Sequence, residues 1–412
     1  GFTEGDREEY EGLVWGGVSM EYSKVGKYYE VFSGYAFKSQ DLKETADIPI
    51  IKIGNISNGR NVINENMQFV SKELLGINKK YYVNRGDVLL SLTGSHMNQP
   101  NSVVGRSCRN YSDRLYLLNQ RAGKIVPKNN ASLSYIYYVL QTQAMKEMIC
   151  CRAYGAANQV NVSPKSIMSI KWNFPSSDVQ HSIASILSTY DTLIENNTKR
   201  IRLLEKMAEN LYKEWFVRFR FPGHENVEME NGLPKGWKYV NFSNLSPILT
   251  GKKDANYASQ NGKYKFFTCS KNDLVADNYS FDCFAIILAG NGDLNVKLYD
   301  GQFEAYQRTY VLSPYDVEHI YVSYYTIQSE LDRLLVGAAG AVIKFLTKGM
   351  IEKIKVLLPT NDVLVRFNSI QEHNYRLRQN LKRQISLLAR QRDLLLPRLM
   401  SGKLEVKEEL LE

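Results

Sequence analysis

The residue types that could carry out catalysis are scattered along the chain. The five histidines, at positions 96, 181, 224, 319 and 373, lack the spacing of metal ligands or of a catalytic triad. The sequence has no G-x-x-x-x-G-K-[ST] loop for nucleotide phosphates and no Pro-Pro of the loop with which amino-methyltransferases hold a target amine. It also has no Pro-Asp pair that could begin a nuclease metal site. We therefore expect this chain to catalyse nothing itself.

One segment imitates a cofactor site. Leu288–Asp293 follows an apolar strand and contains two glycines, as a dinucleotide-binding turn does. The third glycine of such a turn is missing, and the matching segment Leu92–Ser95 has only one glycine. We interpret Leu288–Asp293 as the loop at the end of a strand.

Composition narrows the class of protein. The chain has 412 residues, enough for two or three units, and its net charge of +9 suits a polyanionic partner without proving one. Five cysteines, an odd number without C-x-x-C spacing, favour a reducing compartment over a disulfide framework or a zinc site. No apolar run approaches the roughly 18 residues of a membrane span. We expect a soluble cytoplasmic protein without a membrane partner.

Two stretches have the apolar spacing of long helices that pair with another helix. From about 177 to 219, apolar residues alternate at intervals of four and three, with Asn197 as a polar member of the seam. A second seam, from about 361 to 401, contains Asn374 and is followed by Gly402. Each stretch predicts a helix about 60 Å long at 1.5 Å per residue.

A globular block with β-rich runs precedes each helix. The runs lie at Ile48–Ile53, Asp87–Leu92 and Arg121–Val126 in the first block and at Tyr264–Thr268, Phe284–Leu288 and Thr309–Leu312 in the second. A helical stretch follows late in each block, at about 134–148 and 317–334. The blocks therefore mix strands and helices.

Shared landmarks indicate that the second half of the chain is a diverged copy of the first. At an offset of about 184 residues, Asn119-Gln120-Arg121 matches Tyr306-Gln307-Arg308, Gly155-Ala156-Ala157 matches Gly337-Ala338-Ala339, and strands that end in Pro175 and Pro359 precede the helices. Neither long helix can bury its seam alone, so the two are expected to pair antiparallel. Pairing between copies of the chain is the alternative that the seam leaves open.

The predicted fold class is α/β, with two globular α/β domains joined by two long antiparallel coiled-coil helices and related by a pseudo-twofold axis. The boundaries are an extension or cloning remnant at 1–19, a first domain at 20–176, a long helix at 177–219 and a linker at 220–235. A second domain at 236–360, a long helix at 361–401 and a tail at 402–412 complete the chain.

Several segments resemble the specificity subunits of type I restriction–modification enzymes. Gly34–Ser39, Gly86–Leu90 and Asn119–Arg121 are similar to the first target-recognition domain of that family, and Tyr299–Phe303 is similar to the second. Gly232–Trp237 resembles the opening of the second domain, while Ile186–Asp191 and Leu395–Leu404 resemble the shared helical regions. The resemblance runs from about Met20 to the C-terminus, although the usual Trp-rich opening of the first domain is absent.

The resemblance implies a subunit that reads a bipartite site in double-stranded DNA. It also implies two methyltransferase (modification) subunits on the helices and endonuclease/translocase (restriction) subunits that join them. S-adenosylmethionine, ATP and Mg²⁺ would be cofactors of those partners and not of this chain. A coiled-coil scaffold or adaptor without DNA specificity is the alternative, and a self-sufficient enzyme is disfavoured by the missing motifs.

Residues that could read DNA are polar, basic or aromatic and lie on Gly-rich loops. Arg suits a bidentate contact with guanine and Asn or Gln one with adenine, while Lys more often meets phosphate. In the first block the candidates are Tyr35, Phe37, Lys38, Ser39, Lys52, Asn55, Thr93, Ser95, His96, Asn98, Gln120 and Arg121. In the second block they are Lys252, Lys253, Lys271, Asn272, Asn291, Gln307 and Arg308. The duplication preserves the Gln-Arg pairs. Either a contact with a base or a bond within the fold would explain why both copies keep them.

Basic residues also crowd the second long helix. They are Arg376, Arg378, Lys382, Arg383, Arg390, Arg392 and Arg398. Phosphate contact, a docking face for acidic partner helices and a solvated surface all remain possible for them.

Overall fold

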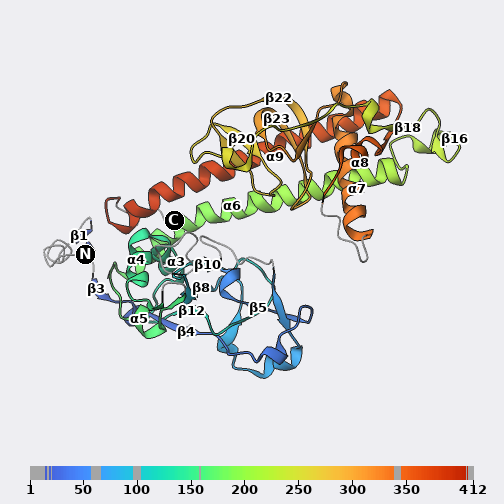
Figure 1. Ribbon diagram of the computed structural model, residues 1–412. Helices are drawn as coiled ribbons and strands as arrows, with labels where there is room; N and C mark the ends of the chain where they lie inside the picture. The colour runs from blue at the N-terminus through green and yellow to red at the C-terminus, as the bar shows by residue number, and fades with distance from the viewer. Residues whose placement is uncertain are drawn as a thin grey trace. The chain divides into compact units, whose positions relative to one another are not determined.

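The structure is a computed structural model that describes residues 14–15, 18–19, 21–56, 66–95, 104–156, 159–337, 345–404 and 406 (Figure 1). The chain forms two compact units, each with one globular block and part of both long helices. Unit 1 comprises Gly1–Asn196 and Gln384–Glu412, and unit 2 comprises Asn197–Arg383. Both units contain sheets and helices, which confirms the α/β fold class.

Unit 1 contains two four-stranded sheets. One has the order β10-β8-β12-β4, with β10 Ser107–Arg109, β8 Val88–Ser91, β12 Ala122–Pro127 and β4 Tyr29–Ser33. The other has the order β6-β5-β11-β7, with β6 Gln68–Val70, β5 Ile48–Ile51, β11 Tyr116–Leu118 and β7 Tyr82–Val83. Short sheets add β13 Tyr154–Ala156, β14 Gln159–Asn161 and β9 Thr93–Gly94, then β15 Lys171–Phe174 with β3 Glu21–Lys24, and β1 Val14–Trp15 with β2 Val18–Ser19.

Four short helices complete the globular part of unit 1. They are α2 Val25–Tyr28, α3 Leu133–Gln141, α4 Gln143–Cys150 and α5 Pro164–Met168. Thr142 caps both α3 and α4 in an extended conformation, so the single helix expected at about 134–148 is two helices. Tyr29, Tyr135 and Phe174 are fully buried with aliphatic residues of the strands, and this core continues onto the long helices.

Unit 2 is built on one six-stranded sheet of order β19-β24-β22-β23-β20-β21. The strands are β19 Ile248–Thr250, β24 Thr309–Leu312, β22 Phe281–Ala289, β23 Val296–Ala305, β20 Tyr264–Phe267 and β21 Leu274–Ala276. Two pairs of strands lie apart from it, β16 Met229–Glu230 with β17 Leu233–Pro234 and β18 Lys238–Asn241 with β25 Lys355–Leu358. Helices α7 Ile320–Gly337 and α8 Lys348–Glu352 accompany the sheet.

Both long helices form as their seams predict. Helix α6 spans Ser177–Tyr212 and continues as a π-helical turn, Lys213–Val217, while α9 spans Asn361–Met400. The helical path of α6 therefore ends slightly before the expected 219, and Phe219 adopts a left-handed φ of 57°. Pro397 lies inside the last turns of α9.

Within each unit the parts of α6 and α9 run antiparallel. In unit 2 the Asn374 side-chain amide donates to the Leu204 carbonyl at 3.0 Å, and the Gln371 amide donates to the Ala208 carbonyl at 3.4 Å. Position along α9 therefore falls as position along α6 rises. In unit 1 Leu187 of α6 shares the buried core with Leu399 of α9. The predicted antiparallel coiled coil is confirmed.

The duplicated frame also appears in the strands. Ala122 pairs with Ser91 across β12 and β8, and Thr309 pairs with Ala289 across β24 and β22. Ala157, Ala338 and Ala339 of the second shared landmark lie outside the described residues. The landmark strands before Pro175 and Pro359 are β15 and β25, each immediately before a long helix.

Candidate nucleic-acid interface

In unit 1 the Gln-Arg pair forms the tight turn between β11 and β12. The backbone N–H of Gln120 donates to the backbone carbonyl of Tyr35 at 2.9 Å. The Arg121 carbonyl accepts from the Leu92 amide at 3.0 Å. These bonds attach the turn to the Gly-rich segment after β4 on one side and to the end of β8 on the other.

In unit 2 the corresponding turn joins β23 to β24 through equivalent bonds. The backbone N–H of Gln307 donates to the backbone carbonyl of Lys253 at 2.9 Å. The backbone carbonyl of Arg308 accepts from the N–H of Gly290, also at 2.9 Å. The duplication therefore preserves the backbone role of each Gln-Arg turn. Structural bonding of the backbone explains the position of the turns, and the side chains remain available for another role.

Two glycines permit the close approach that these bonds require. A Cβ added to Gly34 would lie 2.3 Å from the Leu118 carbonyl oxygen, and one added to Gly251 would lie 1.9 Å from the Ala305 carbonyl oxygen. Both distances are far shorter than any non-bonded contact, so a larger residue would push the loop away from the turn. The segments that begin Gly34-Tyr35 and Gly251-Lys252-Lys253 are thereby held against the Gln-Arg turns.

The side chains of both turns point into solvent. Gln120, Arg121, Gln307 and Arg308 are all exposed, and within the described part of the chain their side chains make no hydrogen bond or ion pair. A guanidinium offers donors in a planar fork, and a carboxamide offers one donor and one acceptor face. Each turn thus presents both groups that suit bidentate contact with the edge of a base.

Aromatic rings cluster at Tyr35, whose backbone bonds to the Gln-Arg turn of unit 1. Tyr35 lies with its ring centroid 5.0 Å from that of Phe37 and 5.5 Å from that of Tyr81, while the Lys80 ammonium sits 5.0 Å from the Tyr81 ring centre. Sequence reasoning proposed Tyr35 and Phe37 but missed Lys80 and Tyr81, whose approach depends on the fold. Their Lys-Lys-Tyr-Tyr run was the available signal.

Other candidates of unit 1 differ in their access to solvent. Lys38 and Ser39 are exposed, Ser95 is half-buried, and the Lys52 ammonium donates to the Gln68 side chain. Asn55 is 4% exposed and accepts from the Lys52 amide at 2.9 Å, so its side chain builds a turn. His96 and Asn98 lie outside the described residues.

Thr93 belongs to the frame and not to the surface. It is 5% exposed, and its hydroxyl donates to the Asn161 side chain at 2.7 Å across β9 and β14. A buried hydroxyl that is already paired has no free donor for a base. We therefore leave Thr93 and Asn55 out of the proposed interface.

Around the turn of unit 2 the candidates are basic. Lys252 is exposed, and the Lys253 ammonium lies 4.3 Å from the centre of the ring of Tyr257, which was not among the residues predicted from the sequence. Asn291 is half-buried and bridges to Phe345. Lys271 and Asn272 are exposed on the segment after β20, and the Asn272 amide donates to the Ser270 hydroxyl at 3.1 Å.

The basic residues of α9 do not form a single exposed surface, because some of them pair with acidic residues of the chain. Arg392 is 2% exposed and paired with Asp191, and Arg378 is 8% exposed beside Glu205. Arg376 pairs with Glu372 on its own helix. These three arginines are engaged by the chain itself, whereas Lys382, Arg383, Arg390 and Arg398 are exposed.

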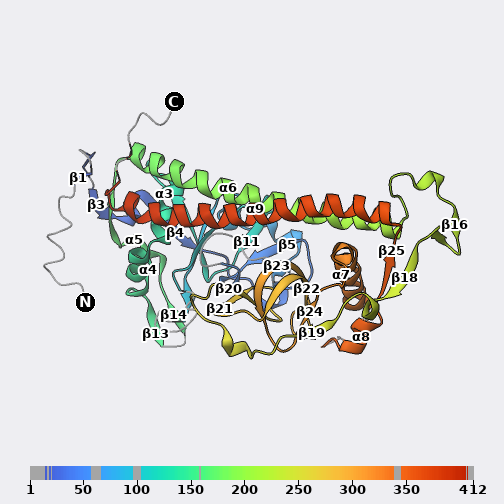
Figure 2. The same ribbon diagram turned by 90° about the horizontal axis from the view of Figure 1, so that it is seen from above.

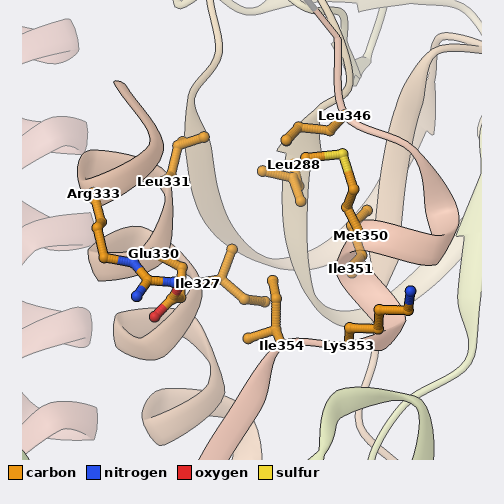
Figure 3. A pocket seen from close by; sticks show the side chains of 10 residues that line it. All are labelled: Leu288, Ile327, Glu330, Leu331, Arg333, Leu346, Met350, Ile351, Lys353 and Ile354. Carbon is orange, nitrogen blue, oxygen red and sulfur yellow. Dashed lines mark hydrogen bonds and ion pairs between the residues drawn. The ribbon is translucent and has the colours of Figure 1, made fainter. Parts of the chain in front are cut away.

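A cavity in unit 2 lies apart from the predicted site residues. It has a volume of about 260 Å³ and is lined mainly by aliphatic side chains of β22, α7 and α8, including Leu288, Ile327 and Ile351 (Figure 3). Glu330 and Arg333, which pair at 2.6 Å, stand at one side of it. Leu288–Asp293 forms the end of β22 and the loop after it, as predicted. The N–H of Gly290 in this loop donates to the Arg308 carbonyl.

Two features of other classes of protein are absent from the described residues. Among the described residues, no three or more His, Cys, Asp or Glu side chains are grouped to hold a metal ion. No helix in the described ranges is both long and apolar enough to cross a membrane.

Two α/β domains of one frame, each presenting an exposed Gln-Arg turn and each attached to paired long helices, define a duplicated recognition protein. A family model described as type I restriction modification DNA specificity domain matches residues 18–206. The type I restriction enzyme MjaIX specificity subunit of Methanocaldococcus jannaschii is 26% identical over 318 residues, which cover 70% of this chain and 73% of that protein. Residues 18–206 thus match the type I restriction modification DNA specificity domain, and the chain over 70% of its length is similar to a specificity subunit of a type I restriction enzyme.

A second relative is similar to part of the sequence, and a solved structure is similar to the fold of nearly the whole chain. The type I restriction enzyme EcoDI specificity subunit of Escherichia coli is 38% identical over 128 residues, 31% of this chain and 29% of that protein. The crystal structure of the type I restriction–modification S subunit from M. genitalium matches 95% of this chain and 97% of that one, with a TM-score of 0.56 at 13% identity. The second match supports the fold alone.

Proposed function

We propose that this specificity subunit reads a bipartite target in double-stranded DNA, with one half-site bound by each globular domain at its Gln-Arg turn. The observation that carries the proposal is the recurrence of an exposed Gln-Arg pair on the same backbone frame in both units. A fold that needed only the backbone bonds would not require these side chains in both copies.

Each turn has neighbours suited to the phosphate backbone and the bases. In unit 1 Tyr35 bridges to Asn119 next to the turn, and its ring contacts that of Tyr81, over which the Lys80 ammonium lies. In unit 2 Lys253 bridges to Tyr306 next to the turn, and Lys38 and Lys252 are exposed on the corresponding segments of the two units. Lysines neutralise phosphates and give sequence-independent affinity, whereas Arg and Gln discriminate between bases. The paired helices would set the spacer between the half-sites.

The chain acts as the recognition component and its partners supply the chemistry. Modification subunits would methylate the DNA and restriction subunits would cleave it, with S-adenosylmethionine, ATP and Mg²⁺ bound by those subunits. Our proposal places two modification subunits on the long helices. The first 19 residues are proposed to lie outside the first recognition domain, and the second domain to span 236–360.

A selection from randomised half-sites tests the proposal. The subunit, assembled with its modification partner, would be compared with Arg121→Ala and Arg308→Ala variants after methylome sequencing has defined the target. Each loss of a bidentate base contact is expected to cost about 1–3 kcal/mol of discrimination in one half-site only. Lys165→Ala on α5 and Lys348→Ala on α8 are matched controls, because both lysines are exposed and lie outside the proposed interface.

The outcomes separate this function from the alternative. A uniform loss of affinity for all sequences would reassign the two arginines to phosphate contact. A chain without salt-sensitive affinity for DNA would be a scaffold, because phosphate neutralisation makes binding fall as salt rises.

A further inference from the structure

Two exposed aromatic side chains lie on segments that backbone pairing joins to the Gln-Arg turns, although these segments are distant from the turns in sequence. Tyr154 is 61% exposed in unit 1, and Phe345 is 62% exposed in unit 2. A single exposed apolar side chain is ordinary on a protein surface. Phe345 has Asn161 as its counterpart at the offset of about 184 residues, and Tyr154 lies one strand beyond Asn161, so each ring belongs to a row of paired residues that begins next to a Gln-Arg turn.

In unit 2, the loop after β22 connects the segment of Phe345 to the Gln-Arg turn. Phe345 bridges antiparallel to Asn291, and the next residue, Leu346, donates its amide to the Gly290 carbonyl at 2.7 Å. The Gly290 amide in turn donates to the Arg308 carbonyl at 2.9 Å. Residues directly opposite in an antiparallel pair project to the same face, so Phe345 shares its face with Asn291.

Tyr310 fixes this arrangement from the neighbouring strand. Its hydroxyl donates to the Leu346 carbonyl at 3.1 Å, and burial raises the pKa of Tyr310, so the donor stays protonated. The segment that carries Phe345 is therefore bonded on one side to the loop after β22 and on the other to β24. The ring is held out beside the turn by backbone that is itself anchored.

In unit 1 the same edge carries one more strand. Thr93 pairs with Asn161 across β9 and β14, and Asn161 pairs with Tyr154 across β14 and β13. Strands β13 and β14 lie side by side in Figure 2. Leu92, immediately before Thr93, donates to the Arg121 carbonyl. The cross-strand row Thr93–Asn161–Tyr154 thus starts next to the Gln-Arg turn and ends in an exposed ring.

We propose that Phe345 and Tyr154 are aromatic DNA contacts, packing against bases of the second and first half-sites beside those read by Arg308 and Arg121. This inference rests on the proposed function and adds apolar contact to it. Each ring is joined to its turn through paired backbone, and DNA is the occupant that the turns themselves select. A phenyl ring can meet a thymine methyl or enter an opened base step, and neither contact requires a charge.

The chemistry of Phe345 makes a distinctive prediction for binding. Stacking on an aromatic residue is worth about 1–3 kcal/mol by alanine substitution, so Phe345→Ala should weaken binding to the cognate site by about 5- to 150-fold. The slope of affinity against salt should stay unchanged, because a phenyl ring neutralises no phosphate. Phe345→Trp should retain binding, since it keeps an aromatic face.

The test uses the full chain assembled with its modification partner and the randomised half-site libraries described above. Phe345→Ala is expected to flatten base preference in the second half-site, and Tyr154→Ala in the first, next to the positions that depend on the arginines. Tyr315→Ala and Tyr22→Ala are controls, because these tyrosines are 75% and 44% exposed and lie elsewhere in units 2 and 1. Thermal unfolding would verify that each variant folds.

Parental affinity and preference in the Phe345→Ala variant, with discrimination lost in the Arg308→Ala variant, would overturn this inference and leave the proposed function standing. An equal loss on specific and non-specific DNA would overturn it as well. Unchanged half-site preference in the aromatic and arginine variants alike would instead refute the proposed function.

Discussion

The buried ion pair between α6 and α9 of unit 1 allows a quantitative prediction. Asp191 and Arg392 pair with side-chain exposures of 5% and 3%, and the Tyr138 hydroxyl donates to the same carboxylate at 2.7 Å. Burial raises the pKa of Tyr138, so it remains a donor beside the carboxylate. Removing one member of a buried pair leaves a charge without its counter-ion, which typically costs about 3–5 kcal/mol.

The two single variants should differ in cost. Arg392 keeps a second carboxylate, Asp393, at 3.0 Å after Asp191→Asn, and Asp393 is 58% exposed, so we expect a loss of about 3 kcal/mol. After Arg392→Met, Asp191 loses its cationic partner while the neutral hydroxyl of Tyr138 still donates to it, and we expect a loss of about 4 kcal/mol. In both variants the destabilisation should appear in unit 1.

Unit 2 suggests a compensating double variant. At the offset of about 184 residues that relates the halves, Tyr375 and Ala208 occupy the places of Asp191 and Arg392. Replacing a buried pair by well-packed neutral residues is often neutral or stabilising. Asp191→Tyr combined with Arg392→Ala should therefore be more stable than either single charge-removing variant.

Hydrogen exchange of the assembled or isolated chain in urea measures these effects unit by unit. Amides of α3 and the first half of α6 report on unit 1, and those of α7 report on unit 2. Glu205→Gln is the control, because its pair with Arg378 is 3.6 Å long and its side chain is 48% exposed, so a loss below about 1 kcal/mol is expected. Additive losses below about 1 kcal/mol for Asp191→Asn and Arg392→Met would refute the reasoning.

Three further expectations concern activity and binding. Methyl transfer should require the modification partner, and transfer to DNA by this chain alone, measured with labelled S-adenosylmethionine, would contradict its assignment as a recognition subunit. Inserting seven residues at facing positions in α6 and α9 adds about 10 Å at 1.5 Å per residue, or about three base pairs, so a random-spacer selection should favour a longer spacer or show loss of specific binding. Retention of the parental spacer at parental affinity would show that the helices do not measure DNA. Lys252→Ala should weaken binding similarly for all sequences and lower the salt slope by about one, whereas a change confined to one base position would make Lys252 a base contact.

Much of the architecture follows from local pattern. The four-and-three spacing located α6 and α9, because a helix repeats its buried face at that interval whatever its partner. Short β-rich runs predicted β5, β8, β20 and β24 to within a few residues. The break at Thr142 was missed, since the apolar spacing continues through it and only a capping bond marks the change of direction.

The DNA interface stays a prediction, but its candidate residues differ in how well the sequence indicated their place in the fold. Duplication of the Gln-Arg pair was visible in the sequence, and both pairs are exposed turns. Asn55 and Thr93 looked equally suitable because loop composition does not reveal which polar side chains point inward. Tyr154 and Phe345 were overlooked because an isolated aromatic residue in a sequence is more often part of a core.

The sequence by itself determined the duplication, the two long helices and the absence of familiar catalytic motifs, since repeats, seams and motifs consist of nearby residues. Only the tertiary structure decided which charges meet. Arg392 looked like part of a basic face, yet it is buried against Asp191, 201 positions away. Only the fold brings Phe345 beside the loop that binds Arg308. Such contacts depend on how whole elements pack, and packing brings together residues whose separation along the chain carries no periodic signal.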